Sequence, residues 1–388
     1  MVQTYTVPFL LTDWLDGFAF GSRLPGASGD GARRRPSRCG TTGSTAAVSL
    51  GDSYIAGEGG RWEGNSTTDW GDRRGTDRAA YRRGWFWRYD QELIYGDSYD
   101  TGCHRSDVAP IHSADLNVDA VFNLACSGAS TINVISSASG GQAYRGEAPQ
   151  VDQLAAVAAT HDVEVVVISV SGNDLGFTDV ILDCVLGYTT STRWNPNTCY
   201  QDQQANLVAE LPDAMAGVAT VLADVQSVLS ANGDADARVI LQSYPSPVPE
   251  SSNIRYRETG WDRTFRGGCP FWDADLDWAN GSLIPTLTDG LQAEAVSAGV
   301  EFLDLSQSMK GHEACAETAR QGASAVDGEW LRFLTTGLRQ GDAEESLHPN
   351  AFGQRAIGEC LALVVAEGSG SDVCINTTGS GPEEMRLN

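Results

Sequence analysis

Residues 46–60 read AAVSLGDSYIAGEGG, in which a short apolar run gives way to a turn rich in glycine. The run 46–50 predicts a buried strand. Ser53 stands directly after it, where the chain turns sharply. A serine hydroxyl is a weak nucleophile until a base takes its proton and hydrogen-bond donors receive the developing negative charge. If Ser53 has that role, the rest of the chain must supply a histidine and an oxyanion hole.

Four further apolar runs have the same β-branched character and read as buried parallel strands. Helical patterns alternate with them, most clearly between Leu211 and Leu229, where apolar residues recur every three or four positions. We expect Pro212 in the first turn of that helix. Alternating strands and helices predict an α/β fold, a five-stranded parallel sheet with helices on both faces. The further runs are 118–124, 163–170, 238–241 and 300–305.

The 388 residues predict one domain with long insertions. Residues 1–44 and 367–388 are rich in glycine and small polar residues, which predicts a flexible N-terminal extension and a C-terminal tail around a domain at 45–366. Three irregular stretches between the predicted elements far exceed the usual connection of about 4 to 6 residues, and such loops often build binding sites. They are 58–117, 172–204 and 244–280.

The chain is strongly acidic, with a net charge of -25. Nucleic acid is therefore not an expected partner, because phosphate binding needs clustered arginine and lysine. An anionic membrane surface would also repel such a chain. No stretch approaches the roughly 18 consecutive apolar residues of a membrane span, so we expect no stable membrane anchor.

The nine cysteines lack the Cys-x-x-Cys spacing of a zinc or redox site, and disulfides are the better interpretation. Disulfides persist in an oxidising compartment, which predicts an extracellular protein, although no signal peptide can be read in residues 1–24. Cys39 is left as the odd thiol. Eight cysteines permit about 105 connectivities, and the local pairs we expect are Cys103 with Cys126, Cys184 with Cys199, Cys269 with Cys315, and Cys360 with Cys374.

Three more polar segments accompany the Ser53 turn. Asn123 to Ala129 and Ser171 to Asp174 each follow a predicted strand, and His348 precedes the last helical pattern. Because the carboxyl ends of parallel strands share one edge of a sheet, Ser53, Gly128 and Asn173 are expected to converge there. His348 can fold over the same edge and supply the base.

These segments resemble those of the SGNH, or GDSL, hydrolase family over residues 45–366, and the stretches 103–107 and 125–128 are similar to secreted actinobacterial members. The resemblance implies a flavodoxin-like three-layer α/β/α sandwich and an esterase, lipase or related acyl hydrolase. It implies Ser53 as nucleophile and His348 as base. Gly128 and Asn173 would be oxyanion donors, with the backbone N–H of Ser53 as a third. The sequence blocks that carry the resemblance are Gly51-Asp52-Ser53, Gly172-Asn173-Asp174 and His348-Pro349-Asn350.

The third member of the triad departs from the family pattern. Family members usually carry aspartate three residues before the histidine, and this chain has Glu345 there. Glutamate is one methylene longer but can still accept from the imidazole N–H and orient the ring. We therefore expect Glu345 to orient His348, with a main-chain carbonyl and Asp342 as the alternatives.

The sequence thus predicts a monomeric, secreted serine ester hydrolase of the carboxylesterase or lipase type. It would cleave short- to medium-chain esters, as small molecules or lipids, through an acyl-enzyme intermediate, with no metal or cofactor. A phospholipase or a polysaccharide acetyl esterase is the enzymatic alternative, and a non-catalytic glycan-binding protein on the same fold is the alternative from another class. We interpret His104, beside Cys103, as structural, because no second ligand lies at metal-binding spacing.

Overall fold

The computed structural model describes residues 43–66, 76–335, 341–368, 370–377 and 379–388. Residues 42–388 form one compact unit by their contacts. The predicted extension at 1–44 lies outside the described residues except for its last two positions, and Cys39 lies outside them as well.

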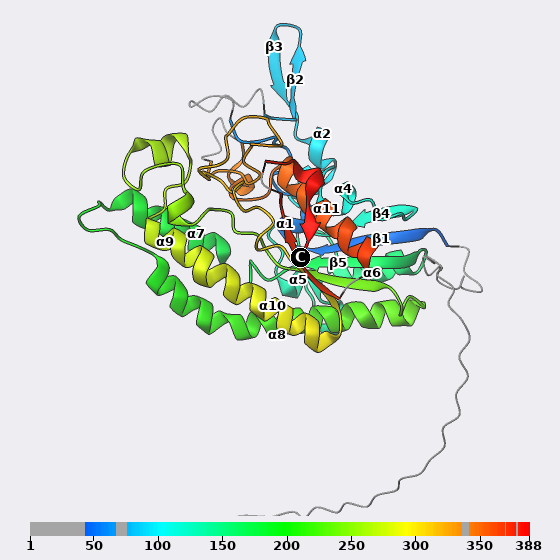
Figure 1. Ribbon diagram of the computed structural model, residues 1–388. Coiled ribbons are helices and arrows are strands. Elements are labelled where there is room, and N and C mark those ends of the chain that lie inside the picture. The colour runs from blue at the N-terminus through cyan, green and yellow to red at the C-terminus, as the bar shows by residue number, and fades with distance from the viewer. Residues whose placement is uncertain (1–42, 67–75, 336–340, 369, 378) are drawn as a thin grey trace, which may run out of the picture. The chain divides into compact units, whose positions relative to one another are not determined.

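A seven-stranded sheet runs through the centre of this unit in the order β4-β1-β5-β6-β7-β8-β9 (Figure 1). Six of its strands are parallel, and β9 pairs antiparallel with β8. The α/β class with a mainly parallel sheet is confirmed, and each of the five predicted runs contributes a strand. The bounds are β1 Thr45–Gly51, β4 Ala120–Asn123, β5 Asp162–Ser169, β6 Arg238–Gln242, β7 Glu301–Asp304, β8 Ser371–Ile375 and β9 Arg386–Leu387.

The last two strands correct the predicted tail at 367–388. Ser371–Ile375 pairs in parallel with β7, and Cys374 is fully buried and bonded to Cys360. The segment is short and largely polar, so it lacks the apolar run that marks the inner strands. Its place in the sheet comes from backbone pairing and the disulfide, neither of which composition reveals.

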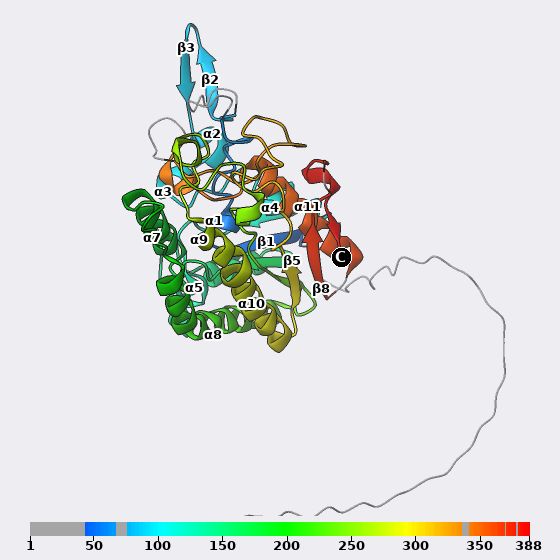
Figure 2. The same cartoon turned by 60° about the vertical axis from the view of Figure 1, so that its left-hand side comes forward.

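Helices cover both faces of the sheet and make it a three-layer structure (Figures 1 and 2). Alternate residues of β5 enter different cores, because successive side chains of a strand point to opposite faces. Val165 and Val167 pack in the core that holds α4 and α11, whereas Val166 and Ile168 pack in the core that holds α6, α8 and α10. The bounds are α4 Pro110–Ser113, α6 Gln150–Ala158, α8 Tyr200–Asn232, α10 Ile284–Ala298 and α11 Ala351–Glu367.

Helix α8 begins earlier than the sequence pattern predicted. It starts at Tyr200, so Pro212 lies in its interior rather than in its first turn. The residues before Pro212 include good helix formers such as Gln, Ala, Leu and Glu, and these extend the helix upstream. By length and composition α8 could cross a membrane. Its apolar face packs against α6 and α10 instead, which is the arrangement of a core helix.

The long irregular stretches lie largely around the carboxyl ends of the strands and contain short elements of their own. A two-stranded hairpin, β2 with β3, stands out from the first stretch in both views (Figures 1 and 2). The remaining elements are α1 Ser53–Ala56, β2 Ala80–Arg83, β3 Phe86–Tyr89, α2 Glu92–Tyr95, α3 Ser98–Thr101, α5 Thr131–Val134, α7 Phe177–Thr190 and α9 Asp273–Trp278.

Among the described residues, four disulfides join the four predicted cysteine pairs. Each bridge closes a loop of the chain, which restricts the unfolded state more than the folded one. Cys184–Cys199 connects α7 to the start of α8. Cys360–Cys374 connects α11 to β8, the strand that pairs with β7 and β9.

The paired substitution Cys360→Ser and Cys374→Ser tests whether residues 371–388 belong to the fold. The bridge spans 14 residues of sequence, and a loop of about 15 residues corresponds to roughly 3 kcal/mol of stabilisation. We expect the free energy of unfolding in denaturant to fall by about that amount and the β8 amides to exchange with solvent faster than those of β5. An unchanged unfolding curve with unchanged exchange at β8 would show that the segment adds nothing to the fold.

Candidate active site

The turn that presents Ser53 requires glycine at its first position. Gly51 ends β1 with a φ of +138°, and a Cβ built there would lie 1.9 Å from the carbonyl oxygen of Ser169, so no other residue fits. The Gln150 side chain holds this glycine from both sides. Gly51 N–H donates to Gln150 Oε1 at 2.6 Å, and Gln150 Nε2 donates to the Gly51 carbonyl at 2.8 Å. Ser53 therefore begins α1 from a fixed strand end.

Asp52 connects this turn to the two neighbouring strand ends. Its carboxylate caps α1 by accepting from Tyr54 N–H at 3.1 Å, and it accepts the Tyr244 hydroxyl at 2.5 Å. The Tyr244 oxygen in turn accepts from Gly172 N–H at 3.2 Å. Burial raises the pKa of Asp52 to about 7, although these hydrogen bonds oppose the shift. The ends of β1, β5 and β6 are thus joined through one buried carboxyl group.

His348 lies against Ser53, at hydrogen-bonding distance. His348 Nε2 is 2.7 Å from Ser53 Oγ. The backbone around the histidine is fixed, because Arg332 N–H donates to its carbonyl at 2.8 Å and the Tyr54 hydroxyl donates to the Leu347 carbonyl at 2.9 Å. Asn350, two residues on, caps α11 by accepting from the N–H groups of Phe352 and Gly353.

The other ring nitrogen of His348 corrects the prediction for Glu345. His348 Nδ1 is 3.0 Å from the main-chain carbonyl of Ser346, which accepts its proton when Nδ1 is the protonated nitrogen. The expectation that the Glu345 carboxylate orients the ring is wrong, and the main-chain carbonyl that stood as an alternative occupies that position. The carboxylate of Asp342, the other alternative, accepts from Arg61 Nη1 at 3.2 Å.

Glu345 faces away from the histidine into a buried polar network. The 3₁₀ turn Ala343–Glu345 makes it the partner of Asp342 in a capping box, with Asp342 N–H donating to Glu345 Oε2 at 3.0 Å. Trp62 Nε1 donates to the same oxygen at 2.7 Å, and the Tyr95 hydroxyl donates to Oε1 at 3.1 Å. Burial raises the pKa of Glu345, while the guanidinium groups of Arg61 and Arg332 act against that shift. Its role in this position is structural.

The predicted oxyanion residues lie on the loops that follow β4 and β5. Gly128 has a φ of +85°, a backbone conformation that residues with a Cβ rarely adopt, so the position favours glycine. Asn173 Nδ2 donates one hydrogen to the Ala129 carbonyl at 2.9 Å, which couples the two loops. The first loop is tied to the Ser53 turn, because Cys126 N–H donates to the Gly51 carbonyl at 3.0 Å.

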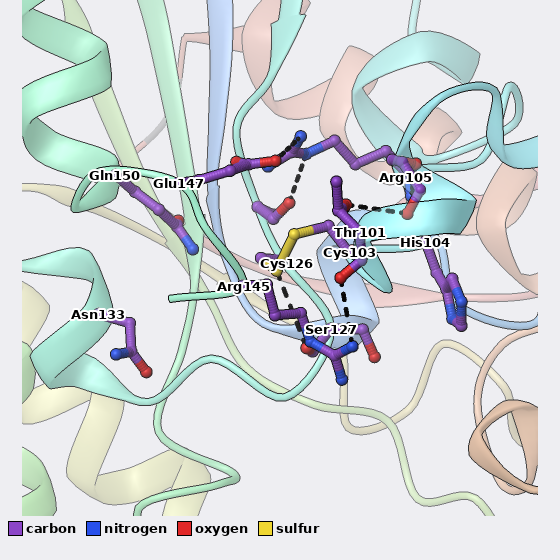
Figure 3. The surroundings of a disulfide bond; sticks show 12 residues. Thr101, Cys103, His104, Arg105, Cys126, Ser127, Asn133, Arg145, Glu147 and Gln150 are labelled. Atoms are coloured by element: carbon purple, nitrogen blue, oxygen red, sulfur yellow. Dashed lines mark hydrogen bonds and ion pairs between the residues drawn. A yellow bond between two sulfur atoms is a disulfide. The ribbon is translucent and has the colours of Figure 1, made fainter. Parts of the chain in front are cut away.

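The Cys103–Cys126 disulfide and Arg105 contact the loop segment from Ala125 to Ser127, just before Gly128 (Figure 3). Ser127 N–H donates to the Cys103 carbonyl at 3.1 Å. Arg105 Nε donates to the Ala125 carbonyl at 2.7 Å, and its guanidinium pairs with Glu147. The loop that carries Gly128 is therefore held by a disulfide and by the hydrogen bonds and ion pair of Arg105.

Sequence reasoning missed Glu58, a buried carboxylate in the same region. Its side chain is fully buried, and its Oε2 lies 2.7 Å from His104 Nδ1. Burial acts to raise the pKa of Glu58, but the His104 hydrogen bond, the His104 charge and the His348 charge lower it below its usual range. A glutamate five residues after Ser53, between Gly57 and Gly59, was the signal available in the sequence. Its partner His104 is 46 residues away and could not be paired with it.

The pKa of His348 reflects this environment. Burial lowers it, whereas the Glu58 charge and the Ser346 carbonyl act to raise it, and the His104 charge opposes them more weakly. A histidine with a lowered pKa is neutral near pH 7, which is the form that can take a proton.

Replacement of Glu345 separates its structural role from any role in chemistry. We expect Glu345→Gln to lower the free energy of unfolding by about 1 to 3 kcal/mol, because the buried Trp62 and Tyr95 donors lose their charged acceptor. Arg61 keeps its ion pairs with Asp77 and Asp342 in this variant. Ester turnover per folded molecule should stay within about tenfold of wild type, since the ring of His348 keeps its Ser346 carbonyl. Glu301→Gln, which removes the partly exposed partner of Arg238, is the control and should cost less. A loss of turnover by orders of magnitude with unchanged stability would restore Glu345 to the triad.

Comparisons with known proteins identify the family of the chain. The model of the GDSL-like lipase/acylhydrolase family matches residues 94–356, more than half of the chain, a region that includes His348 but not the Ser53 turn. Similar solved structures include an extracellular lipase from Streptomyces rimosus, at 22% identity and a TM-score of 0.45 over 82% of this chain and 98% of that chain. A carbohydrate acetylesterase from Sinorhizobium meliloti is similar at 14% identity and a TM-score of 0.35, over 84% and 99%. No curated protein matches the chain. The match to the family model shows that this chain belongs to the GDSL-like lipase/acylhydrolase family.

Proposed function

We propose that this protein is a serine ester hydrolase in which Ser53 is the nucleophile and His348 the general base. The observation that carries the proposal is the 2.7 Å contact between His348 Nε2 and Ser53 Oγ. It joins residues 295 positions apart in sequence at the carboxyl end of β1. A neutral imidazole at this distance can take the hydroxyl proton as the oxygen attacks.

The reaction follows from these positions. Ser53 Oγ forms a bond to the ester carbonyl carbon while its proton moves to His348 Nε2. The tetrahedral intermediate breaks the bond to the leaving oxygen, which takes the proton from Nε2 and departs as an alcohol. Water then attacks the acyl-enzyme by the same route, giving the acid and restoring Ser53. The Ser346 carbonyl holds Nδ1–H, so Nε2 is the nitrogen that faces the serine.

Gly128 and Asn173 supply the oxyanion hole in this proposal. Gly128 has no Cβ, so its backbone N–H can approach the developing oxyanion. Asn173 Nδ2 uses one hydrogen on Ala129 and keeps a second for the substrate. The Ser53 N–H is the third donor. Each donor of this kind is typically worth about 3 to 4 kcal/mol of transition-state stabilisation.

Glu58 supplies the negative charge that Glu345 does not. A proton on His348 makes an imidazolium in a buried site, which is unfavourable without a nearby anion. Glu58 is the carboxylate whose charge acts most on the ring, and it is kept ionised by His104. Gly59 places this segment against the histidine, since a Cβ there would lie 3.4 Å from His348 Cβ. We assign Glu58 as a positioning residue that stabilises the charged base.

We propose carboxylic esters with short to medium acyl chains as the substrates. Phospholipids or acetylated polysaccharides are the alternative substrates. Binding of a glycan without turnover is the non-enzymatic alternative. Four disulfides favour an extracellular site of action. We propose that the catalytic domain begins at residue 45, as the sequence predicted, and that it extends past residue 366 to include β8 and β9.

The first test is hydrolysis of p-nitrophenyl acetate, butyrate, octanoate and palmitate by wild type and by Ser53→Ala. We expect wild type to release p-nitrophenol and the variant to lose activity by about 10³-fold or more, because no other group takes the acyl chain. The chain-length profile then separates an acetyl esterase from a lipase. If both proteins are equally inert on all four esters and on phospholipid and acetylated glycan, the proposal fails.

The pH dependence of kcat/KM tests Glu58. The acid limb reports the pKa of His348 in the free enzyme, and the Glu58 charge raises that pKa whereas the His104 charge lowers it. Glu58→Gln removes the anion and disfavours the imidazolium, so the limb should move to lower pH and kcat should fall about tenfold, or about 1.4 kcal/mol. His104→Gln removes the positive charge that keeps Glu58 ionised, so the limb should move in the same direction as in Glu58→Gln. Limbs that coincide with wild type in both variants would exclude an electrostatic role for the pair.

A further inference from the structure

The β2–β3 hairpin carries an exposed aromatic tip. It projects away from the helices and the sheet in both views (Figures 1 and 2), and every residue from 81 to 89 is exposed. Trp85 is 92% exposed and Phe86 is 71% exposed. Residues 80–89 hold five aromatic side chains among ten positions, Tyr81, Trp85, Phe86, Trp87 and Tyr89. A protruding cluster of this kind marks a surface that meets a partner.

The hairpin is also basic in a strongly acidic chain. Residues 80–89 contain three arginines and no aspartate or glutamate, while the whole chain has a net charge of -25. The antiparallel register sets each arginine opposite an aromatic residue, pairing Arg82 with Trp87, Arg83 with Phe86 and Arg88 with Tyr81. Within the part of the chain that the structure describes, none of the three arginines forms a salt bridge. Their guanidinium groups are therefore available to an anionic partner.

The base of the hairpin is anchored in the body of the protein. Asp90 N–H donates to the Ala79 carbonyl at 3.0 Å, and Ala79 packs with Ile94 and Tyr95 in a small buried cluster. Just before the hairpin, Asp77 pairs with the buried Arg61 at 2.8 Å. The tip thus stands on a fixed support, on the segment that follows the Ser53 turn.

We propose that this hairpin docks the protein on an anionic lipid surface. Trp85 and Phe86 would enter the boundary between headgroups and acyl chains, where aromatic rings are favoured. Arg82, Arg83 and Arg88 would bind lipid phosphates, which the planar guanidinium group suits. A glycan fits less well, because no side chain of residues 80–89 is an amide or carboxylate that could accept from sugar hydroxyls. Docking of this kind makes lipid esters at an interface the substrate class of the proposed enzyme. It depends on the proposed function only for the turnover of those esters.

The overall negative charge sets a condition on this docking. A strand of four residues spans roughly 13 Å, which exceeds the Debye length of about 8 Å at physiological ionic strength. At that salt concentration the tip meets the lipid before the repulsion of the acidic body is felt. At low salt the screening length grows and repulsion returns, whereas high salt weakens the contacts between arginine and phosphate. Binding should therefore be strongest at intermediate ionic strength.

The test is co-sedimentation of the full chain with sucrose-loaded vesicles of equal parts phosphatidylglycerol and phosphatidylcholine. All proteins carry Ser53→Ala, so that the lipid is not consumed. We expect the tip variant Trp85→Ser/Phe86→Ser and the charge variant Arg82→Gln/Arg83→Gln/Arg88→Gln each to bind about tenfold less or weaker still. Trp194→Ser is the matched control, since Trp194 is 82% exposed and lies 4.3 Å from the guanidinium of Arg193 but is outside the hairpin. Its binding should equal that of the parent.

Several results would overturn the proposal. They are no sedimentation of the parent at any salt concentration, equal sedimentation of the hairpin variants, an equal loss in Trp194→Ser, or hairpin-dependent binding to an insoluble polysaccharide instead of vesicles. Turnover of p-nitrophenyl acetate, measured with Ser53 intact, should be unchanged in the hairpin variants. Docking can therefore fail while turnover persists, and a protein inert toward every ester fails the proposed function whether or not it binds vesicles.

Discussion

The hydrogen bond from the Tyr244 hydroxyl to the Asp52 carboxylate, 2.5 Å long, joins the ends of β1 and β6. Through Gly172 N–H it also reaches the end of β5. Asp52 is thus the point at which three strand ends are set relative to one another, and Ser53 and Asn173 each lie one residue from this link. Because the atoms involved are buried and hydrogen-bonded to one another, the turn that carries Ser53 has little freedom to relax. The positions of the serine and of the Asn173 loop follow from this constraint.

Two buried carboxylates near His348, those of Glu345 and Glu58, have different roles. Glu345 accepts from Trp62, Tyr95 and the backbone of Asp342, so its charge is used to hold the loop that carries His348. Glu58 is held by His104 and acts on the imidazole through its charge. Orientation of the ring comes from a third group, the Ser346 carbonyl. Functions that a single triad carboxylate combines are thus divided among a carbonyl, a structural glutamate and a nearby anion.

The sequence predicted the inner strands and the residues at their ends because both have local signals. Apolar β-branched runs mark β1, β5 and β6, and the polar blocks after the strands mark the site. The prediction failed where the contact that determines the structure joins residues far apart in the sequence. Spacing placed Glu345 three residues before His348 but could not say that a capping box turns its side chain toward Arg61 and Trp62. The polar strand β8 has no apolar run, so only its pairing with β7 and the Cys374 bridge reveal its place in the sheet.

The most direct measurement is covalent labelling with a p-nitrophenyl alkylphosphonate, followed by mass spectrometry of the peptides. Such a reagent reacts with a serine only where a base activates it and an oxyanion hole receives the charge. We expect one phosphonylated residue, Ser53, with labelling lost in His348→Ala and retained in Glu345→Gln. Labelling at another serine, or labelling that survives His348→Ala but is lost in Glu345→Gln, would contradict it.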